Sequence, residues 1–332
     1  MCARNDSGGI TNKHLKLVEL RLEDIESICS PEFISQLDKV ILCGNYGDPM
    51  MATDTLPILK YFRKHNPDLI LQVHTNGSGQ SQEWWMELAS IVSYCQFGID
   101  GLADTNHLHR RRTNWNKIMS SASSFINAGG KAGWEFIVFK HNEHQIEEAV
   151  ALAKTMGFSR FCLRKTNRFF SGGSFRPKFT VLNRSGEREF DIFPADSKEY
   201  LNPASVRIDE MIKKGTDYVT YLRETEISCE AKEIGMLYLS AEGLVFPCPF
   251  TGTIYSWTTD LRDNQVLKML SNYGGIEAID AKKKKLSEIV NGPVFQQGFF
   301  EGQKRGGGRL NVCAYVCGEC MQVKSQYTTS LI

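Results

Sequence analysis

The stretch Lys39-Val40-Ile41-Leu42-Cys43-Gly44-Asn45-Tyr46-Gly47-Asp48-Pro49 joins a short apolar run to a loop with two glycines and one acidic residue. The run Lys39–Cys43 predicts a strand, and the glycines predict a sharp turn after it. A helix is expected next, over about Thr53–Lys64, followed by a second strand over Leu69–Val73. Such strand–helix–strand units form parallel sheets with right-handed crossovers.

The same alternation continues as far as Arg164. Strands are also expected over Cys95–Ile99, Trp134–Phe139 and Phe161–Arg164, and helices over Leu22–Cys29, Gln82–Val92, Trp115–Asn127 and Glu143–Met156. The strands read as continuous apolar runs, which indicates a parallel sheet covered on both faces. Because they are too few to close an eight-stranded barrel, the sequence predicts an α/β fold with an open, partial barrel.

The composition excludes several classes of protein. The 332 residues carry a formal net charge of +1, which argues against a nucleic-acid binder. No apolar run approaches the roughly 18 residues of a membrane-spanning helix, and the first residues lack a signal-peptide pattern. We therefore expect a cytoplasmic protein without nucleic-acid or membrane partners, in which disulfides are uncommon.

The pattern of the chain changes after about Asn167. Residues 168–226 are rich in charged residues and show no clear periodicity. Beyond them, Met236–Leu239 and Leu244–Phe246 are expected to form a β-hairpin. Helices are expected over Leu261–Leu270 and Ala281–Ile289, with Lys282–Lys285 on a solvated helix face.

Five of the ten cysteines are confined to two short regions. Cys229 is followed by thirteen residues, Gly243, four residues and Cys248, and the run Cys313-x3-Cys317-x2-Cys320 lies near the end of the chain. The expected hairpin would bring Cys229 and Cys248 to one end of a small domain. Thiolates at such spacing suit a zinc ion or an iron–sulfur cluster, and which four of the five bind stays open.

The other cysteines of the chain's interior show no such grouping. They are Cys29, Cys43, Cys95 and Cys162. Each lies on or beside an expected helix or strand, so we predict that all four are buried thiols that pack as small apolar side chains.

Polar and glycine residues follow three of the expected strands. They are Gly44, Gly47, Asp48 and Pro49 after the first strand, Asn76 after the second and Asp100 after the third. The carboxyl ends of parallel strands form the edge at which α/β folds bind ligands. A carboxylate there, such as Asp48, can accept hydrogen bonds from a ligand ammonium group.

Together these residues resemble the radical S-adenosylmethionine enzymes that carry a C-terminal SPASM or twitch-type auxiliary-cluster domain. Met1–Asn5 is similar to the end of that family's Cys-x3-Cys-x2-Cys loop, with Cys2 as the third cysteine. Gly47-Asp48-Pro49 stands where the family has Gly-Glu-Pro, the motif that binds the amino group of the cofactor's methionine. The spacing from Cys229 to Cys248 matches the opening of the SPASM signature, and only three later cysteines follow, which implies one auxiliary cluster, as in the twitch form.

The resemblance implies a fold as well as a chemistry. The fold is a partial (β/α)6 TIM-like barrel, with its first strand apparently missing, followed by a small α+β cysteine-rich domain. The chain then divides into barrel residues 1–167, connecting or substrate-access residues 168–226 and auxiliary-cluster residues 227–332. Asn76 and Asp100 are expected to approach the cofactor, and Arg110–Arg112 could supply a cation for its carboxylate.

The implied cofactors are a radical [4Fe–4S] cluster held by three cysteines, S-adenosyl-L-methionine and one auxiliary [4Fe–4S] cluster. Reductive cleavage of the cofactor gives a 5′-deoxyadenosyl radical, which abstracts hydrogen from a peptide, protein or small-molecule substrate. An electron donor such as flavodoxin or ferredoxin is implied. Because Cys2 alone cannot hold a three-thiolate cluster, we expect the chain as printed to be N-terminally truncated and inactive. The alternative is a non-catalytic adaptor, a degenerate barrel with a four-cysteine zinc site.

Overall fold

A parallel sheet of five strands, in the order β1-β2-β3-β4-β5, forms the centre of the barrel region. The computed structural model describes residues 4–257, 264–300, 304, 308–319 and 330–332. The strands are β1 (Lys39–Leu42), β2 (Ile70–Thr75), β3 (Tyr94–Gly98), β4 (Ala132–Ile137) and β5 (Arg160–Arg164). The number of strands and their parallel pairing confirm the expected sheet, and they fit a partial barrel.

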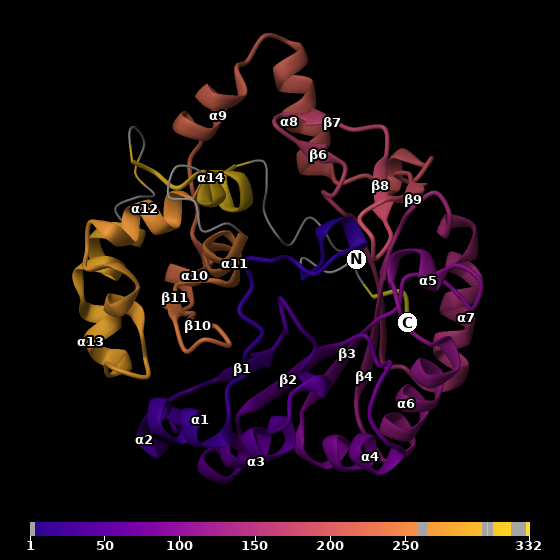
Figure 1. Cartoon of the computed structure of the whole chain (residues 1–332). Coiled ribbons are helices and arrows are strands. Elements are labelled where there is room, and N and C mark those ends of the chain that lie inside the picture. The colour runs from indigo at the N-terminus through magenta and orange to yellow at the C-terminus, as the bar shows by residue number, and fades with distance from the viewer. Residues whose placement is uncertain (1–3, 258–263, 301–303, 305–307, 320–329) are drawn as a thin grey trace.

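Helices connect the strands and cover the outer face of the sheet (Figure 1). They are α1 (Leu22–Ile28), α2 (Pro31–Ile34), η2 (Pro49–Met51), α3 (Thr55–His65), α4 (Gln82–Ile91), α5 (Asn106–His109), α6 (Trp115–Asn127), η3 (Glu143–Gln145) and α7 (Ile146–Met156). Capping side chains set two of the starts, because Ser81 accepts a hydrogen bond from the Trp84 amide and Asn114 from the Lys117 amide. The sequence pattern did not indicate the short helices α2 and α5.

The two faces of the sheet differ in polarity. Phe97 of β3 points to the outer face, where its ring packs against Trp85 of α4 and Phe125 of α6. Its neighbour Gln96 and the inner-face residue Glu135 of β4 point the other way, because successive side chains of a strand alternate. The strands are buried on the outer face, whereas the inner face carries polar side chains, of which Glu135 is buried and Gln96 is half-buried. The inner face is polar because single polar residues alternate with apolar residues within the short strands.

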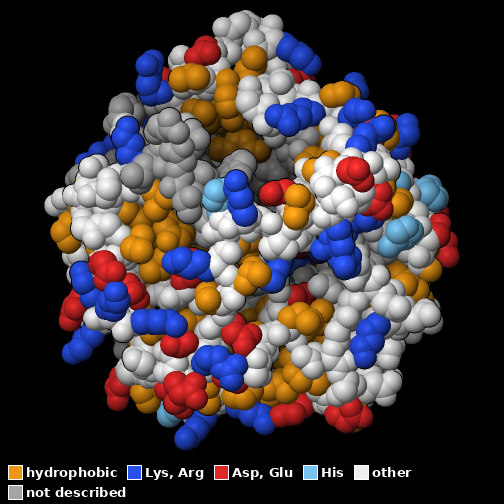
Figure 2. Space-filling view, in the orientation of Figure 1, with side chains coloured by type: hydrophobic (Ala, Val, Ile, Leu, Met, Phe, Trp, Pro, Cys, Tyr) orange, Lys and Arg blue, Asp and Glu red, His pale blue; other side chains and the backbone are white. Residues whose placement is uncertain are grey.

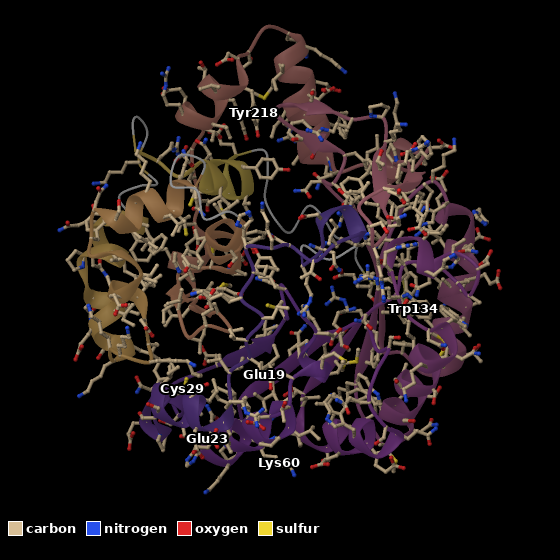
Figure 3. The ribbon with its side chains drawn as sticks, viewed as in Figure 1. Glu19, Glu23, Cys29, Lys60, Trp134 and Tyr218 are labelled. Atoms are coloured by element: carbon tan, nitrogen blue, oxygen red, sulfur yellow. The ribbon has the colours of Figure 1, made fainter. Side chains whose placement is uncertain are left out.

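The connecting region consists of short elements, which explains why its sequence shows no long period. They are β6 (Phe170–Ser171), β7 (Ser174–Phe175), β8 (Phe179–Leu182), β9 (Arg188–Ile192), η4 (Lys198–Tyr200), α8 (Pro203–Lys213) and α9 (Tyr218–Glu224). Two antiparallel hairpins, β6–β7 and β8–β9, lead into the two helices. Figure 3 shows Tyr218 in this region, at the top of the molecule, and Trp134 on the barrel side.

The cysteine-rich region is mainly helical. Its elements are α10 (Glu230–Glu233), β10 (Tyr238–Leu239), β11 (Val245–Phe246), α11 (Pro249–Trp257), α12 (Gln265–Ser271), η5 (Gly275–Ile279), α13 (Leu286–Asn291), η6 (Val294–Phe299) and α14 (Asn311–Cys317). The expected hairpin is confirmed as β10 paired with β11. The helix expected from Ala281 begins only at Leu286, so the prediction that Lys282–Lys285 forms a helix face is wrong. Lys282 instead pairs with Asp24 of α1 at 2.9 Å.

One hydrophobic core joins the barrel to the cysteine-rich region, and it includes Phe97 of β3 and Phe246 of β11. Near the end of the chain, the Leu331 amide donates to the Phe161 carbonyl of the edge strand β5 at 2.8 Å. Basic and acidic side chains are interspersed on the face shown in Figure 2, in keeping with the small net charge. None of the helices in the described ranges has both the length and the apolar character of a membrane span.

Candidate functional site

Asp48 ties the loop after β1 to the end of β2. Its Oδ1 atom accepts hydrogen bonds from the Thr75 hydroxyl at 2.8 Å and the Met50 amide at 3.2 Å. Its Oδ2 atom accepts from the backbone and side-chain nitrogens of Asn76, both at 2.7 Å. A carboxylate has about four lone-pair sites, so protein donors already engage Asp48 fully. The carboxylate thus holds the loop against the neighbouring strand.

Two further features fix the shape of this loop. Gly44 adopts φ of +53°, and a Cβ atom there would lie 2.8 Å from both the Gly47 carbonyl and the Pro49 ring. Only glycine fits such a position without strain. Burial raises the pKa of Asp48, while its hydrogen bonds and the nearby Arg110 act in the opposite direction. The Gly44 conformation and the hydrogen bonds to Asp48 thus fix the loop, within which the Gly47 amide also donates to the Gly44 carbonyl at 3.2 Å.

Asp100, directly after β3, is the centre of a buried charged cluster. Its Oδ2 atom lies 2.6 Å from His109 Nδ1 and 2.5 Å from Arg110 Nε, and its Oδ1 atom accepts from the Ile137 amide at 2.8 Å. Burial by itself would raise the pKa of Asp100, but Arg110 and His109 hold it below its usual value. Asp100 is therefore charged, and it links the ends of β3 and β4.

The three consecutive arginines have separate roles. Arg110 lies over Gly98, where a Cβ atom would come within 2.5 Å of its guanidinium, and it faces both Asp100 and Asp48. Arg111 pairs with Glu189 of β9 at 2.5 Å, and Arg112 donates to the Gly9 carbonyl at 2.8 Å. The strand-end site consists of the residues at the carboxyl ends of β1, β2 and β3, namely Gly44–Pro49, Asn76 and Asp100. Arg110 is the one of the three arginines that belongs to it.

Tyr46 connects the loop after β1 to two other parts of the chain. Its hydroxyl donates to the Thr253 carbonyl of α11 at 2.6 Å. Its own carbonyl accepts from Arg4 Nη1 at 3.0 Å. The loop therefore contacts both the N-terminal segment and the helix that follows Cys248. No local pattern pointed to Tyr46, since its partners lie far away along the chain.

Four cysteines line one cavity of about 160 Å³ in the cysteine-rich region. They are Cys229, Cys248, Cys313 and Cys317. Most of the other lining residues are apolar, among them Met236, Phe299 and Val316. Cys229 precedes α10, Cys248 precedes α11, and the other two lie on α14. The chain thus brings together cysteines from both of the regions that the sequence singled out.

The thiols of this cavity are close enough to influence one another. Burial raises the pKa of Cys313, and the neighbouring Cys248, Cys317 and Cys229 raise it further. Burial, Cys229 and Cys248 likewise raise the pKa of Cys317 to about 12. Within the described part of the chain, no three His, Cys, Asp or Glu side chains converge closely enough to hold a single metal ion. The four thiols line the cavity from three segments of the chain, around α10, α11 and α14.

The remaining cysteines differ in their positions. Cys29, Cys95 and Cys162 are buried, which confirms the prediction for these three, whereas Cys43 is only partly buried and the prediction is wrong there. Cys43 directly follows β1, and its thiol lies 3.5 Å from Asn45 Oδ1. Cys2 and Cys320, predicted as cluster ligands, lie outside the described residues.

The inner face of the sheet is the set of polar residues that sequence reasoning missed. It carries Gln72 and His74 on β2, Gln96 on β3 and Glu135 on β4, with Arg164 at the end of β5. The signal was present in the alternation of Ile70-Leu71-Gln72-Val73-His74-Thr75, in which every second residue is polar or exposed.

Comparison with known proteins gives matches among solved structures only. No family model matches the chain, and no curated protein does. Histidine-tagged anSMEcpe with bound AdoMet is 12% identical, with a TM-score of 0.52, covering 91% of this chain and 78% of that one. Native anSMEcpe with bound AdoMet and Kp18Cys peptide is 11% identical, with a TM-score of 0.50, covering 99% and 91%.

A third match is more distant in structure. Streptococcus suis SuiB bound to S-adenosylmethionine is 15% identical, with a TM-score of 0.44, covering 73% of this chain. The chain spans 56% of the length of that protein. The likeness to anSMEcpe shows the fold, a mixed α/β arrangement around a five-stranded parallel sheet.

Proposed function

We propose that the chain belongs to a radical S-adenosylmethionine enzyme whose cysteine-rich region holds one auxiliary [4Fe–4S] cluster. The observation that carries the proposal is the cavity lined by Cys229, Cys248, Cys313 and Cys317. The fold shared with anSMEcpe, which has been solved with bound AdoMet, supports it. The strand-end site at Asp48 and Asp100 supports it as well, because that edge is where α/β folds bind ligands.

Four thiols around a cavity suit either a zinc ion or an iron–sulfur cluster. Zinc requires four ligand atoms at about 2.0–2.3 Å from one centre. A [4Fe–4S] cluster takes one thiolate on each iron and so needs ligands spread around a larger body. Cys229, Cys248, Cys313 and Cys317 are its proposed ligands among the described residues, and Cys320, which lies outside them, remains a fifth candidate.

The bound cluster would supply one-electron transfer. Chain residues would serve it in two ways. Met236, Phe299 and Val316 form apolar walls, which would disfavour added negative charge on a four-thiolate cluster and so lower its reduction potential. Tyr46 links the cavity's helix α11 to the strand-end loop, so the two sites keep a fixed relation.

At the strand-end site the residues would act on S-adenosyl-L-methionine. The backbone of Gly44–Gly47 offers hydrogen-bonding groups, and Asp48 holds that backbone in place. Arg110, which lies over Gly98 and beside Asp100, would supply a cation for the methionine carboxylate. Gly44, Gly47, Asp48, Pro49, Asn76 and Asp100 remain our proposed cofactor-binding set. A peptide is the proposed substrate, supported by the likeness to anSMEcpe solved with a bound peptide, and a flavodoxin or ferredoxin remains the proposed donor.

Anaerobic reconstitution with iron and sulfide tests the cluster. We expect about four irons and four sulfides per chain, with the broad absorption of a [4Fe–4S] cluster. Cys248→Ala and Cys313→Ala should each lose most of this iron. Cys43→Ser is the matched control, because Cys43 lies outside the cavity, and it should retain full loading.

The same samples separate the zinc hypothesis from the cluster. Zinc binding at one ion per chain, with no iron or sulfide retained after reconstitution, would establish the adaptor and contradict the enzyme.

A further inference from the structure

The inner face of the sheet forms a continuous polar surface below the strand-end site. Pairing places His74 of β2 beside Gln96 of β3, and Gln72 beside Tyr94. Glu135 of β4 pairs with Gly98, two residues beyond Gln96 toward the carboxyl ends of the strands. Residues that are paired in parallel strands point to the same side of the sheet. These side chains therefore share one surface, opposite the helix-covered apolar face.

Direct contacts organise this surface. Gln72 Nε2 lies 2.7 Å from His74 Nε2, and the Tyr94 hydroxyl donates to Gln96 Oε1 at 3.1 Å. Arg164 Nη1 donates to Glu135 Oε1 at 3.0 Å. Gly133 leaves room for the Tyr94 hydroxyl, since a Cβ atom there would overlap it. The surface is thus fixed before any ligand arrives.

Its charges are already compensated. Arg164 neutralises Glu135, and both are at least partly buried. Burial lowers the pKa of His74, so this ring is neutral at pH 7, although Glu135 opposes the effect and Arg164 adds to it. The other charged residues of this face, Lys39 and Arg160, lie at the amino ends of their strands, away from the ligand edge. Among the described residues, a charged ligand group would therefore meet no unpaired opposite charge in the middle of the surface.

One polar group on this surface lacks a hydrogen-bond acceptor among the described residues. Gln96 Nε2 is buried and has no hydrogen-bond partner among the described residues. A buried donor left without an acceptor is costly, so such a group calls for a ligand or a water. An amide ligand matches a carboxamide in either orientation of the Gln96 side chain, because both groups carry one carbonyl and one N–H edge.

We propose that Gln96, with Gln72 and His74, binds an uncharged amide of the substrate, such as a peptide bond or a side-chain carboxamide. This proposal rests on the proposed function, because it takes the bound amide to be part of the enzyme's substrate. A peptide segment would lie across the inner face, with one of its amides on Gln96 and its reacting carbon nearer the strand ends.

Nuclear magnetic resonance of the reconstituted full chain tests the proposal with three small probes of similar size. N-acetylglycine N-methylamide is neutral, N-acetylglycine carries a carboxylate, and glycine N-methylamide carries an ammonium group. We expect only the neutral diamide to shift the side-chain amide resonances of Gln96, which are assigned by their loss in Gln96→Met. Unmoved Gln96 resonances, or equal shifts with a charged probe, would overturn the proposal.

A matched pair of variants provides a second readout. Saturation transfer to the diamide should fall at least tenfold in Gln96→Met and stay unchanged in Gln82→Met, which makes the same change on the exposed outer helix α4. Undiminished transfer in a folded Gln96→Met would contradict the site. If that variant does not fold, the Gln96 resonances of the wild-type chain are assigned through their nuclear Overhauser contacts to the Tyr94 ring, and their shifts carry the test. Failure of iron loading together with a Gln96 shift would reject the proposed function and leave the amide site standing.

Discussion

The strand-end site and the cysteine cavity satisfy their polar groups in opposite ways. At the strand ends, the carboxylates of Asp48 and Asp100 already have protein donors and cations around them. In the cavity, four thiols face a space with mainly apolar walls. The first site is complete as a protein structure, whereas the thiols of the second are the ligands of the cluster proposed above.

This difference indicates how each site depends on its ligand. Hydrogen bonds and ion pairs fold the strand-end loop without help. The cavity holds four thiols near each other. Bonds from these thiols to the proposed cluster would stabilise that arrangement strongly. We therefore expect metal removal to loosen the cysteine-rich region far more than the sheet. The following predictions test that contrast, from the largest expected effect to the smallest.

Removal of the metal should have the largest effect. After reconstitution and then chelation, backbone amides of α11 and α14 should exchange with solvent at least about tenfold faster, because the ligand bonds no longer hold them. Amides of β2, β3 and β4 should change by less than about twofold. Hydrogen exchange read by mass spectrometry gives both numbers in one sample. A uniform change across sheet and cavity would remove the contrast.

Loss of Asp48 should damage the strand-end site next. Asp48→Ala leaves the donors of Thr75, Met50 and Asn76 without their acceptor, so we expect a loss of about 2–4 kcal/mol in the free energy of unfolding. Urea denaturation at neutral pH measures it. Asp68→Ala, at an exposed aspartate before β2, should change stability by less than about 0.5 kcal/mol.

Tyr46→Phe should uncouple the two sites with a smaller cost. It removes one hydroxyl hydrogen bond to Thr253 and keeps the ring, so about 1 kcal/mol is expected. The more specific readout is local, since faster exchange should appear in residues 44–49 of the variant while the iron content is unchanged. If exchange in that loop equals the wild-type rate, Tyr46 does not couple the sites.

The pH dependence should be smallest, and it should come from the barrel. Burial lowers the pKa of His141 to about 4, with Asp100 opposing the shift and His107 adding to it. The unfolded chain then binds more protons than the folded chain between about pH 6.5 and 4, so stability falls as pH decreases through that window. After discounting for the partial exposure of the ring, we expect this effect to be on the order of 1 kcal/mol. In His141→Gln the unfolding midpoint should fall less as the pH decreases from about 6.5 to 4. If it falls as steeply as in the wild type, other groups cause the pH dependence.

The parts of the fold that follow from local patterns could be read from the sequence. The five strands, the helices α3, α4, α6 and α7 and the β10–β11 hairpin were predicted close to their observed bounds. Periodicity and capping residues act over a few residues, so one stretch of chain contains the whole signal. Errors arose where the local pattern was ambiguous, as at Lys282–Lys285, which precede α13 and in which Lys282 pairs with Asp24.

The candidate sites divide in the same way. Residue types and spacing singled out the cysteines at 229–320 and the strand-end residues Asp48 and Asp100, because metal ligation and strand ends leave marks along the chain. Only the tertiary structure brought four cysteines around one cavity, gave Asp48 its donors from β2 and aimed Gln96 at the inner face. Those facts depend on which distant residues meet, and chain packing decides that, since no local pattern encodes the partner of a buried polar group.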